Sequence, residues 1–114
     1  MFFKKSFEID PYRVKDDVVF RNGTEALNLF VKADDGLLVA TLQKINKRLS
    51  SLNDASTAEE KENIAFAFAS CIFGDEQAEK LMNFYDRDPV VVIAVCGQYF
   101  KERLSKIITK VQKK

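Results

Sequence analysis

The sequence predicts an α+β fold, in which a β-hairpin or small antiparallel sheet within residues 1–31 packs on a four-helix part. Two segments rich in apolar side chains, residues 18–21 and 24–31, flank Asn22-Gly23, which is typical of a hairpin. From residue 36 onward the apolar spacing changes to three and four residues, the period of an amphipathic helix. Capping residues, glycine and proline divide this second part into predicted helices at 36–52, 57–73, 75–85 and 89–112.

The first predicted strand covers residues 1–10 and ends before Pro11. One face of it would carry Phe3, Phe7 and Ile9. For residues 12–17 the sequence does not predict pairing with another strand. In the hairpin that follows, Asn22-Gly23 favours a two-residue type I′ turn, because both turn positions need positive φ. Val19 would then share a face with Ala26 or with Leu27, depending on the register.

The helix at 36–52 would begin at Asp34 or Asp35, either of which can cap its first amides. Its apolar stripe consists of Leu38, Leu42, Ile45, Leu49 and Leu52. This 4-3-4-3 spacing suits either core packing or a coiled-coil-like contact with a partner helix. Over little more than two heptads, core packing is the favoured interpretation.

The helix at 57–73 opens with a capping box formed by Thr57 and Glu60. One side of it carries Ile64, Phe68, Cys71 and Ile72. Phe66 and Phe73 lie away from that side, so the helix is either sandwiched between neighbours, which we favour, or covered by a partner. Gly74 would end it, and Asp75 would cap the next helix at 75–85.

The last helix, at 89–112, begins with Asp88 as N-cap and Pro89 in the first turn. The β-branched residues 90–95 also fit a buried strand. A helix is favoured because one helical face continues through Val92, Ile93, Cys96, Phe100, Leu104, Ile107, Ile108 and Val111. Gly97 either weakens this helix by ~1 kcal/mol relative to alanine or marks a close helix crossing.

The length of 114 residues predicts a single domain, 1–114. The net charge is +1, but residues 54–90 hold three Lys or Arg against nine Asp or Glu, whereas residues 91–114 hold six against one. Lys4 and Lys5 lead into acidic residues rather than an apolar core, which predicts a cytoplasmic chain without a secretory signal. Cys71 and Cys96 are therefore expected to be reduced, buried thiols.

The residues offer little for catalysis. The chain has no histidine and only four glycines, which excludes histidine-based acid–base chemistry and leaves no phosphate-binding loop. Carboxylate pairs occur at Asp16/Asp17, Asp34/Asp35, Glu59/Glu60 and Asp86/Asp88. All lie at predicted loops or helix starts, where capping explains them. We therefore predict a non-enzymatic protein with no catalytic residue, no metal site and no cofactor.

The order of the predicted elements resembles that of a known family. It consists of a hairpin around Asn22-Gly23, a helix after Asp34-Asp35, a second helix and a lysine-rich last helix. The segment Ile72-Phe73-Gly74, Ala78-Glu79-Lys80 and Phe84-Tyr85 resembles the same family. The chain is similar to the small tail assembly chaperones, also called minor tail proteins, of long-tailed phages and prophages of Gram-positive bacteria.

The resemblance implies a protein that binds the tape measure protein, or other tail proteins, and keeps it soluble in the bacterial cytoplasm. It also implies homo-oligomers and, in many members, a frameshifted longer form. A chaperone for helices needs apolar side chains that a partner can reach. The predicted partner contacts are Phe66, Phe73, Met82, Phe84 and Tyr99. Two alternatives are a structural head–tail or tail-completion component of the particle and a small DNA-binding regulator that uses the basic last helix.

Overall fold

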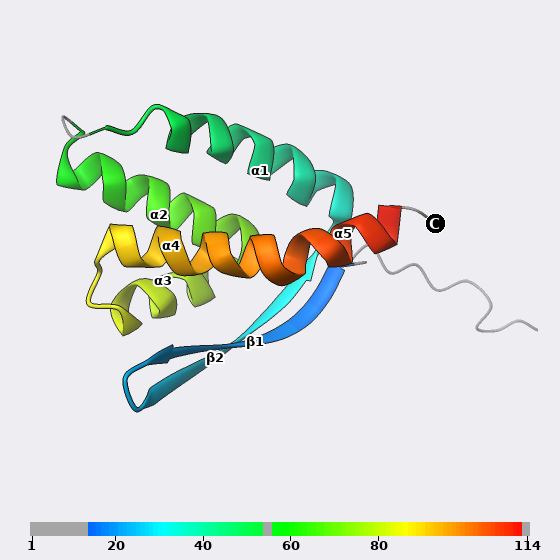
Figure 1. Cartoon of the computed structure of the whole chain (residues 1–114), viewed down its shortest axis with the longest axis horizontal. Coiled ribbons are helices and arrows are strands. Elements are labelled where there is room, and N and C mark those ends of the chain that lie inside the picture. The colour runs from blue at the N-terminus through cyan, green and yellow to red at the C-terminus, as the bar shows by residue number, and fades with distance from the viewer. Residues whose placement is uncertain (1–13, 54–55, 113–114) are drawn as a thin grey trace, which may run out of the picture.

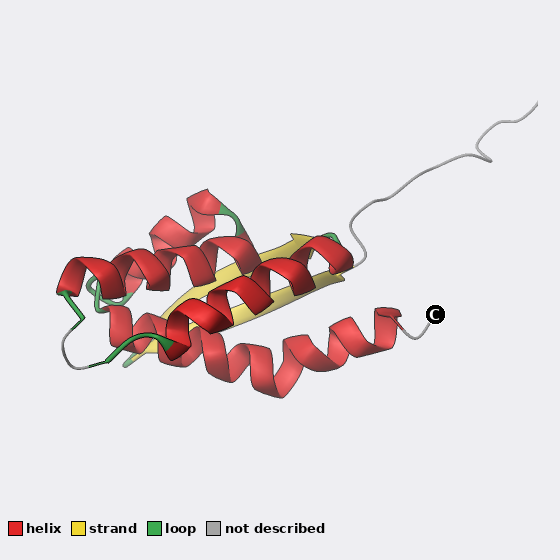
Figure 2. Cartoon of the chain, turned by 90° about the horizontal axis from the view of Figure 1, so that it is seen from above, coloured by secondary structure: helices red, strands yellow, loops and turns green. Residues whose placement is uncertain are grey.

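The computed structural model describes residues 14–53 and 56–112, and within them it confirms the α+β fold (Figure 1). Its elements are β1 (Val14–Asn22), β2 (Glu25–Ala33), α1 (Asp35–Ser50), α2 (Ala58–Phe73), α3 (Asp75–Phe84), α4 (Pro89–Tyr99), the π-helical turn η1 (Phe100–Leu104) and α5 (Ser105–Gln112). The hairpin lies along one side of the helices (Figure 2). The strand predicted at residues 1–10 lies outside the described residues.

The hairpin turn is shifted by one residue from the prediction. Asn22 pairs with Glu25, so the two turn residues are Gly23 and Thr24. Gly23 has φ +68° and Thr24 is not among the positive-φ residues, a pattern that fits a type II′ rather than a type I′ turn. This register places Phe20 opposite Leu27 on the inner face, where an Asn22-Gly23 turn would have set it opposite Glu25.

Strand β1 is longer than predicted, because it begins at Val14 rather than near residue 18. Its inner face carries the buried Val14 and Phe20, while Val19 is 54% exposed. Val19 shares the outer face with Ala26 and not with Leu27, which selects one of the two predicted registers. The early start of β1 is hidden in the sequence by Asp16. This residue lies on the inner face between Val14 and Val18 and interrupts the apolar alternation that would indicate a strand.

The segment from Phe73 to Tyr85, which carries most of the family resemblance, attaches the hairpin to the helices. The side-chain amide of Gln77 accepts from the Phe30 amide at 3.0 Å and donates to the Phe30 carbonyl at 2.8 Å. Tyr85 Oη donates to the Arg21 carbonyl at 2.8 Å. Gln77 thus mimics a neighbouring strand on the edge of β2, so these polar groups are used within the molecule.

Three helix starts confirm the predicted caps. The Asp34 side chain accepts from the Leu37 amide at 2.9 Å, and Thr57 and Glu60 form both bonds of the capping box. Asp88 accepts from the amides at the start of α4. The prediction for Asp75 is wrong, because its carboxylate accepts instead from the Ser70 hydroxyl, and the residue before α3 is Gly74 with φ +88°.

Helix α2 is the centre of the core and contacts α1, α3, α4 and β2, which confirms the predicted sandwich. Ala65 and Ala69 are fully buried on it, and such small residues let neighbouring elements approach closely. Phe73 stacks on Tyr99 with ring centroids 5.9 Å apart, and Phe20 meets Phe73 edge-on at 5.7 Å. This aromatic cluster joins the hairpin, α2 and the last helix, and such pairs add about 0.5–1.5 kcal/mol each beyond area burial.

Residues 89–112 form one helix, which we call the C-terminal helix, and its start confirms helix over strand at Val90–Val95. Beyond Cys96 the predicted face is confirmed at the buried Leu104 and Ile108 and wrong at Phe100, because the buried residue there is Tyr99. Tyr99 and Leu104 are both buried although they are five residues apart, whereas Phe100 is half-buried. The π turn absorbs one extra residue, so it changes the phase that a regular 3.6-residue period would have kept.

Replacing Gly97 with alanine is expected to raise the free energy of unfolding by about 0.5–1 kcal/mol, because glycine lowers helix stability by that amount. A Cβ built at Gly97 meets nothing within 4 Å. Of the two interpretations of Gly97, the structure therefore contradicts the close helix crossing, and a methyl group has room. Urea denaturation of the two proteins would measure the difference. A loss of stability would show that the surroundings of Gly97 are tighter than the structure has them.

Candidate partner-binding groove

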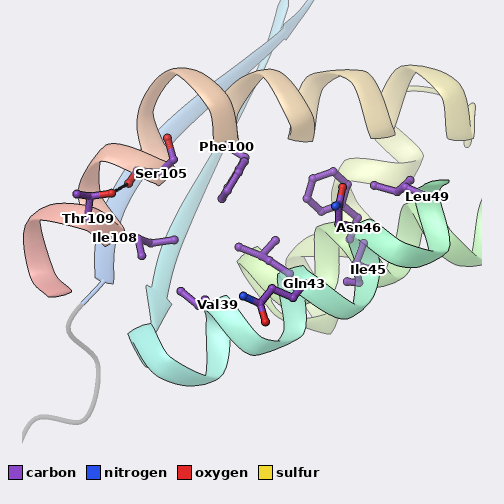
Figure 3. Close-up of a pocket in the computed structure, with 11 residues that line it drawn as sticks. Val39, Gln43, Ile45, Asn46, Leu49, Phe100, Ser105, Ile108 and Thr109 are labelled. Carbon is purple, nitrogen blue, oxygen red and sulfur yellow. Dashed lines mark hydrogen bonds between the residues drawn. The ribbon is translucent and has the colours of Figure 1, made fainter.

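An open groove lies between α1 and the C-terminal helix, with α2 as its floor (Figure 3). Its volume is about 450 Å³. Helix α1 contributes Val39, Leu42, Gln43, Ile45, Asn46 and Leu49. The opposite wall consists of Phe100, Ser105, Ile108 and Thr109, and Phe68 of α2 lies below. We call this site the α1 groove.

The apolar stripe of α1 explains why the groove is apolar. Leu38 and Ile45 are 2% and 5% exposed and belong to the core. Leu42 and Leu49, from the same stripe, are only half-buried and line the groove. Figure 3 shows Val39 facing Ile108 across the gap. The favoured interpretation of the stripe as core is thus confirmed for Leu38 and Ile45, while Leu42 and Leu49 pack against the core and keep a surface that a partner can reach.

The π turn builds the opposite wall. The Ser105 amide donates to the Phe100 carbonyl, which leaves the Lys101 carbonyl without the amide it would bond in a regular α-helix. The Ser105 hydroxyl reaches that carbonyl at 3.3 Å, and the Thr109 hydroxyl donates to the Ser105 carbonyl at 2.8 Å (Figure 3). With these polar groups paired inside the helix, the wall offers a partner mainly the apolar surface of the half-buried Phe100, whereas Ile108 is only 6% exposed.

A buried carboxylate holds the C-terminal helix at the π turn. The Asp16 side chain is 8% exposed and its two oxygens accept from Tyr99 Oη at 2.9 Å and Arg103 Nη2 at 2.6 Å. Burial and the bond to Asp16 raise the pKa of Tyr99, so the phenol stays protonated and keeps donating. Asp16 was predicted at a loop, but it lies within β1 and fixes the wall of the groove against the hairpin.

Three of the five predicted partner contacts lie in the core. Phe73 is 6%, Met82 0% and Tyr99 7% exposed, so the expectation that a partner can reach them directly is wrong. The cause is that α3 packs its Met82 side against the core, while Tyr99 lies on the same face of α4 as the buried Val92 and Cys96. Phe66 and Phe84 are half-buried, and they contribute to the core rather than to the α1 groove.

The two thiols are unpaired in the structure, with Cys96 buried and Cys71 half-buried. Burial raises the pKa of each to about 12 from the usual 9.0. They are therefore protonated at neutral pH and poor nucleophiles. Among the residues that the structure describes, no group of three or more His, Cys, Asp or Glu side chains is placed to hold a metal ion.

Raising the pH is expected to destabilise the protein progressively between the thiol pKa of 9.0 and about 12. An unfolded chain releases the thiol protons near the lower value, whereas the folded chain holds them to the higher one. The stabilisation is thus fully present below the lower value and lost as pH rises through the higher one. Urea denaturation across this range would show it, and a Cys71→Ala/Cys96→Ala variant should lose less stability on the same rise.

No helix within residues 14–53 and 56–112 combines the length and the apolar character needed to span a membrane. No protein-family model, no curated protein and no solved structure matches the chain. The α1 groove has apolar walls, and its rim carries the uncharged polar side chains of Gln43 and Asn46.

Proposed function

We propose that this protein is a non-enzymatic tail assembly chaperone of a long-tailed phage or prophage. It would bind an amphipathic helix of the tape measure protein in the α1 groove and keep that protein soluble in the host cytoplasm. The observation that carries the proposal is a groove whose walls, from Val39 to Leu49 on one side and Phe100 to Thr109 on the other, are apolar yet open. The family resemblance names the partner, and the groove supplies a means of binding it.

The length of the α1 groove suits a helix. Val39 and Leu49 are ten positions apart, which at the rise of an α-helix is ~15 Å, or nearly three turns. A partner helix laid between α1 and the C-terminal helix could place apolar side chains at i, i+3 or i+4, and i+7 against the half-buried Leu42, Leu49 and Phe100. Gln43 and Asn46 at the rim could then bond its polar edge.

Co-expression with the tape measure protein from the same genome tests the proposal. The wild-type protein is expected to give a soluble complex that elutes together in size-exclusion chromatography. Leu42→Glu would place a charge on the groove wall and should weaken the complex at least ~10-fold, because an unpaired charge in an apolar contact is costly. Val90→Glu is the matched control, since Val90 is 62% exposed and does not line the α1 groove.

The proposal fails if the tape measure protein stays insoluble, or if Leu42→Glu and Val90→Glu bind equally well. Mass spectrometry of purified particles distinguishes the structural alternative, because an assembly chaperone should be missing from the finished particle. Binding to DNA at low ionic strength, lost on adding salt, would favour the regulator.

A further inference from the structure

We infer that the α1 groove selects a helix with acidic residues at i and i+4 along one flank. This inference rests on the proposed binding of a helix in the groove and specifies the chemistry of that partner. It depends on the lysines beside the groove, on their spacing along the C-terminal helix and on the residues that line the groove.

Two lysines of α5 form a row beside the groove. Lys110 follows Lys106 by four residues, and residues four apart lie one above the other on a helix. Both side chains are exposed. We call this pair the lysine row.

This lysine row borders the α1 groove. A second hollow, lined by Ser105, Lys106, Thr109 and Lys110, shares Ser105 and Thr109 with the groove. A helix seated between α1 and the C-terminal helix therefore has one flank beside Lys106 and Lys110. No aspartate or glutamate lines either hollow in the part of the chain that the structure describes.

The spacing of the lysines fixes the spacing of the acidic residues. Lys106 and Lys110 are one turn apart, which is ~6 Å along the helix axis. Glutamates at i and i+4 of a partner helix that runs beside α5 have the same separation and can face both lysines together. The apolar walls supply most of the binding, and the lysine row decides between partner helices and sets their orientation.

Three synthetic helical peptides of about 20 residues test the inference. They share one apolar stripe and differ only at the flank positions i and i+4, which carry glutamate, glutamine or lysine. Fluorescence anisotropy with the full chain should give the tightest binding for the glutamate peptide. Two exposed ion pairs predict about a 2- to 30-fold advantage over the glutamine peptide. That advantage should shrink at high salt, because the screening length falls from ~10 Å at 0.1 M to ~3 Å at 1 M.

Two charge-reversed variants separate a local effect from that of net charge. Lys106→Glu/Lys110→Glu should abolish the preference for glutamate or invert it towards the lysine peptide. Lys44→Glu/Lys80→Glu changes the net charge equally at exposed residues that line neither hollow and should keep the preference.

The outcomes distinguish the inference from the proposed function. If all three peptides bind equally and Leu42→Glu weakens each of them, the groove binds helices but the inference is wrong. If no peptide binds, groove binding itself fails. If both charge-reversed variants lose the preference to the same extent, the selection comes from net charge and not from the lysine row. Displacement of the glutamate peptide by a DNA duplex at equal concentration would also overturn the inference.

Discussion

Deleting Lys101 is expected to leave the protein folded, whereas deleting Ala94 is expected to lower the free energy of unfolding by about 2–5 kcal/mol. Both residues are exposed and belong to the same long helix. They differ in the local geometry: Ala94 is within the regular helix α4, while Lys101 is within the π turn η1. The estimate for Ala94 combines the loss of Val92 from the core with disruption of the first turn.

The expectation follows from helical phase. Without Ala94, the turn before it rotates by ~100° relative to the turn after it. Val92 then lies six residues rather than seven before Tyr99, ~120° around the helix from it, and can no longer share its buried face. Without Lys101, Tyr99 and Leu104 become four residues apart, which is the spacing a regular α-helix needs to keep both inside. The deletion would thus convert the π turn into an ordinary turn and would preserve the faces on either side.

Circular dichroism and urea denaturation of the two deletion variants would measure these effects. A Lys101→Ala variant is the control for the loss of the side chain alone and should match the wild type within about 0.5 kcal/mol. Equal destabilisation by the two deletions would contradict the assignment of Lys101 to an inserted position. Equal destabilisation would show that the π turn itself stabilises the fold, rather than being an insertion that the fold tolerates.

The predicted helix starts were largely correct because capping is local chemistry. Asp34, Thr57 with Glu60, and Asp88 each bond amides within three residues of themselves. The register of the hairpin and the phase of the C-terminal helix depend on contacts between distant segments. Tyr99 and Asp16 are 83 positions apart, and the hydrophobic period within either segment does not predict that they form a hydrogen bond.

The candidate site was only partly predictable for the same reason. Leu42 and Leu49 belong to the stripe for which a partner-helix contact was one of two interpretations. Their neighbours Leu38 and Ile45 are indistinguishable by spacing, and only the packing of α1 on α2 separates core from groove. A spacing of four residues after Cys96 predicts Phe100 and Leu104 in the core and leaves Tyr99 outside. The structure instead buries Tyr99, three residues after Cys96, and the π turn supplies the extra residue that still brings Leu104 inside.

Replacing Met82 with alanine is expected to lower the free energy of unfolding by about 2–5 kcal/mol, the usual cost of removing a large core side chain. Met82 is 0% exposed and belongs to the core cluster, so alanine leaves a cavity that no solvent can fill favourably. Met82→Leu conserves volume and should cost less than about 1.5 kcal/mol. Urea denaturation of both variants would give the two differences.

Variants of Met82 also distinguish an effect on stability from an effect on binding, because Met82 is one of the predicted partner contacts. Its side chain does not line the α1 groove, so Met82→Leu should bind the glutamate peptide as tightly as the wild-type protein. Leu42→Glu should show a loss of binding larger than its loss of stability explains, because Leu42 packs against the core on one side and lines the groove wall on the other. Met82→Leu could instead weaken peptide binding without a loss of stability. The partner surface would then have to include α3, which carries the predicted contact Met82. This outcome would contradict the α1 groove as the binding site.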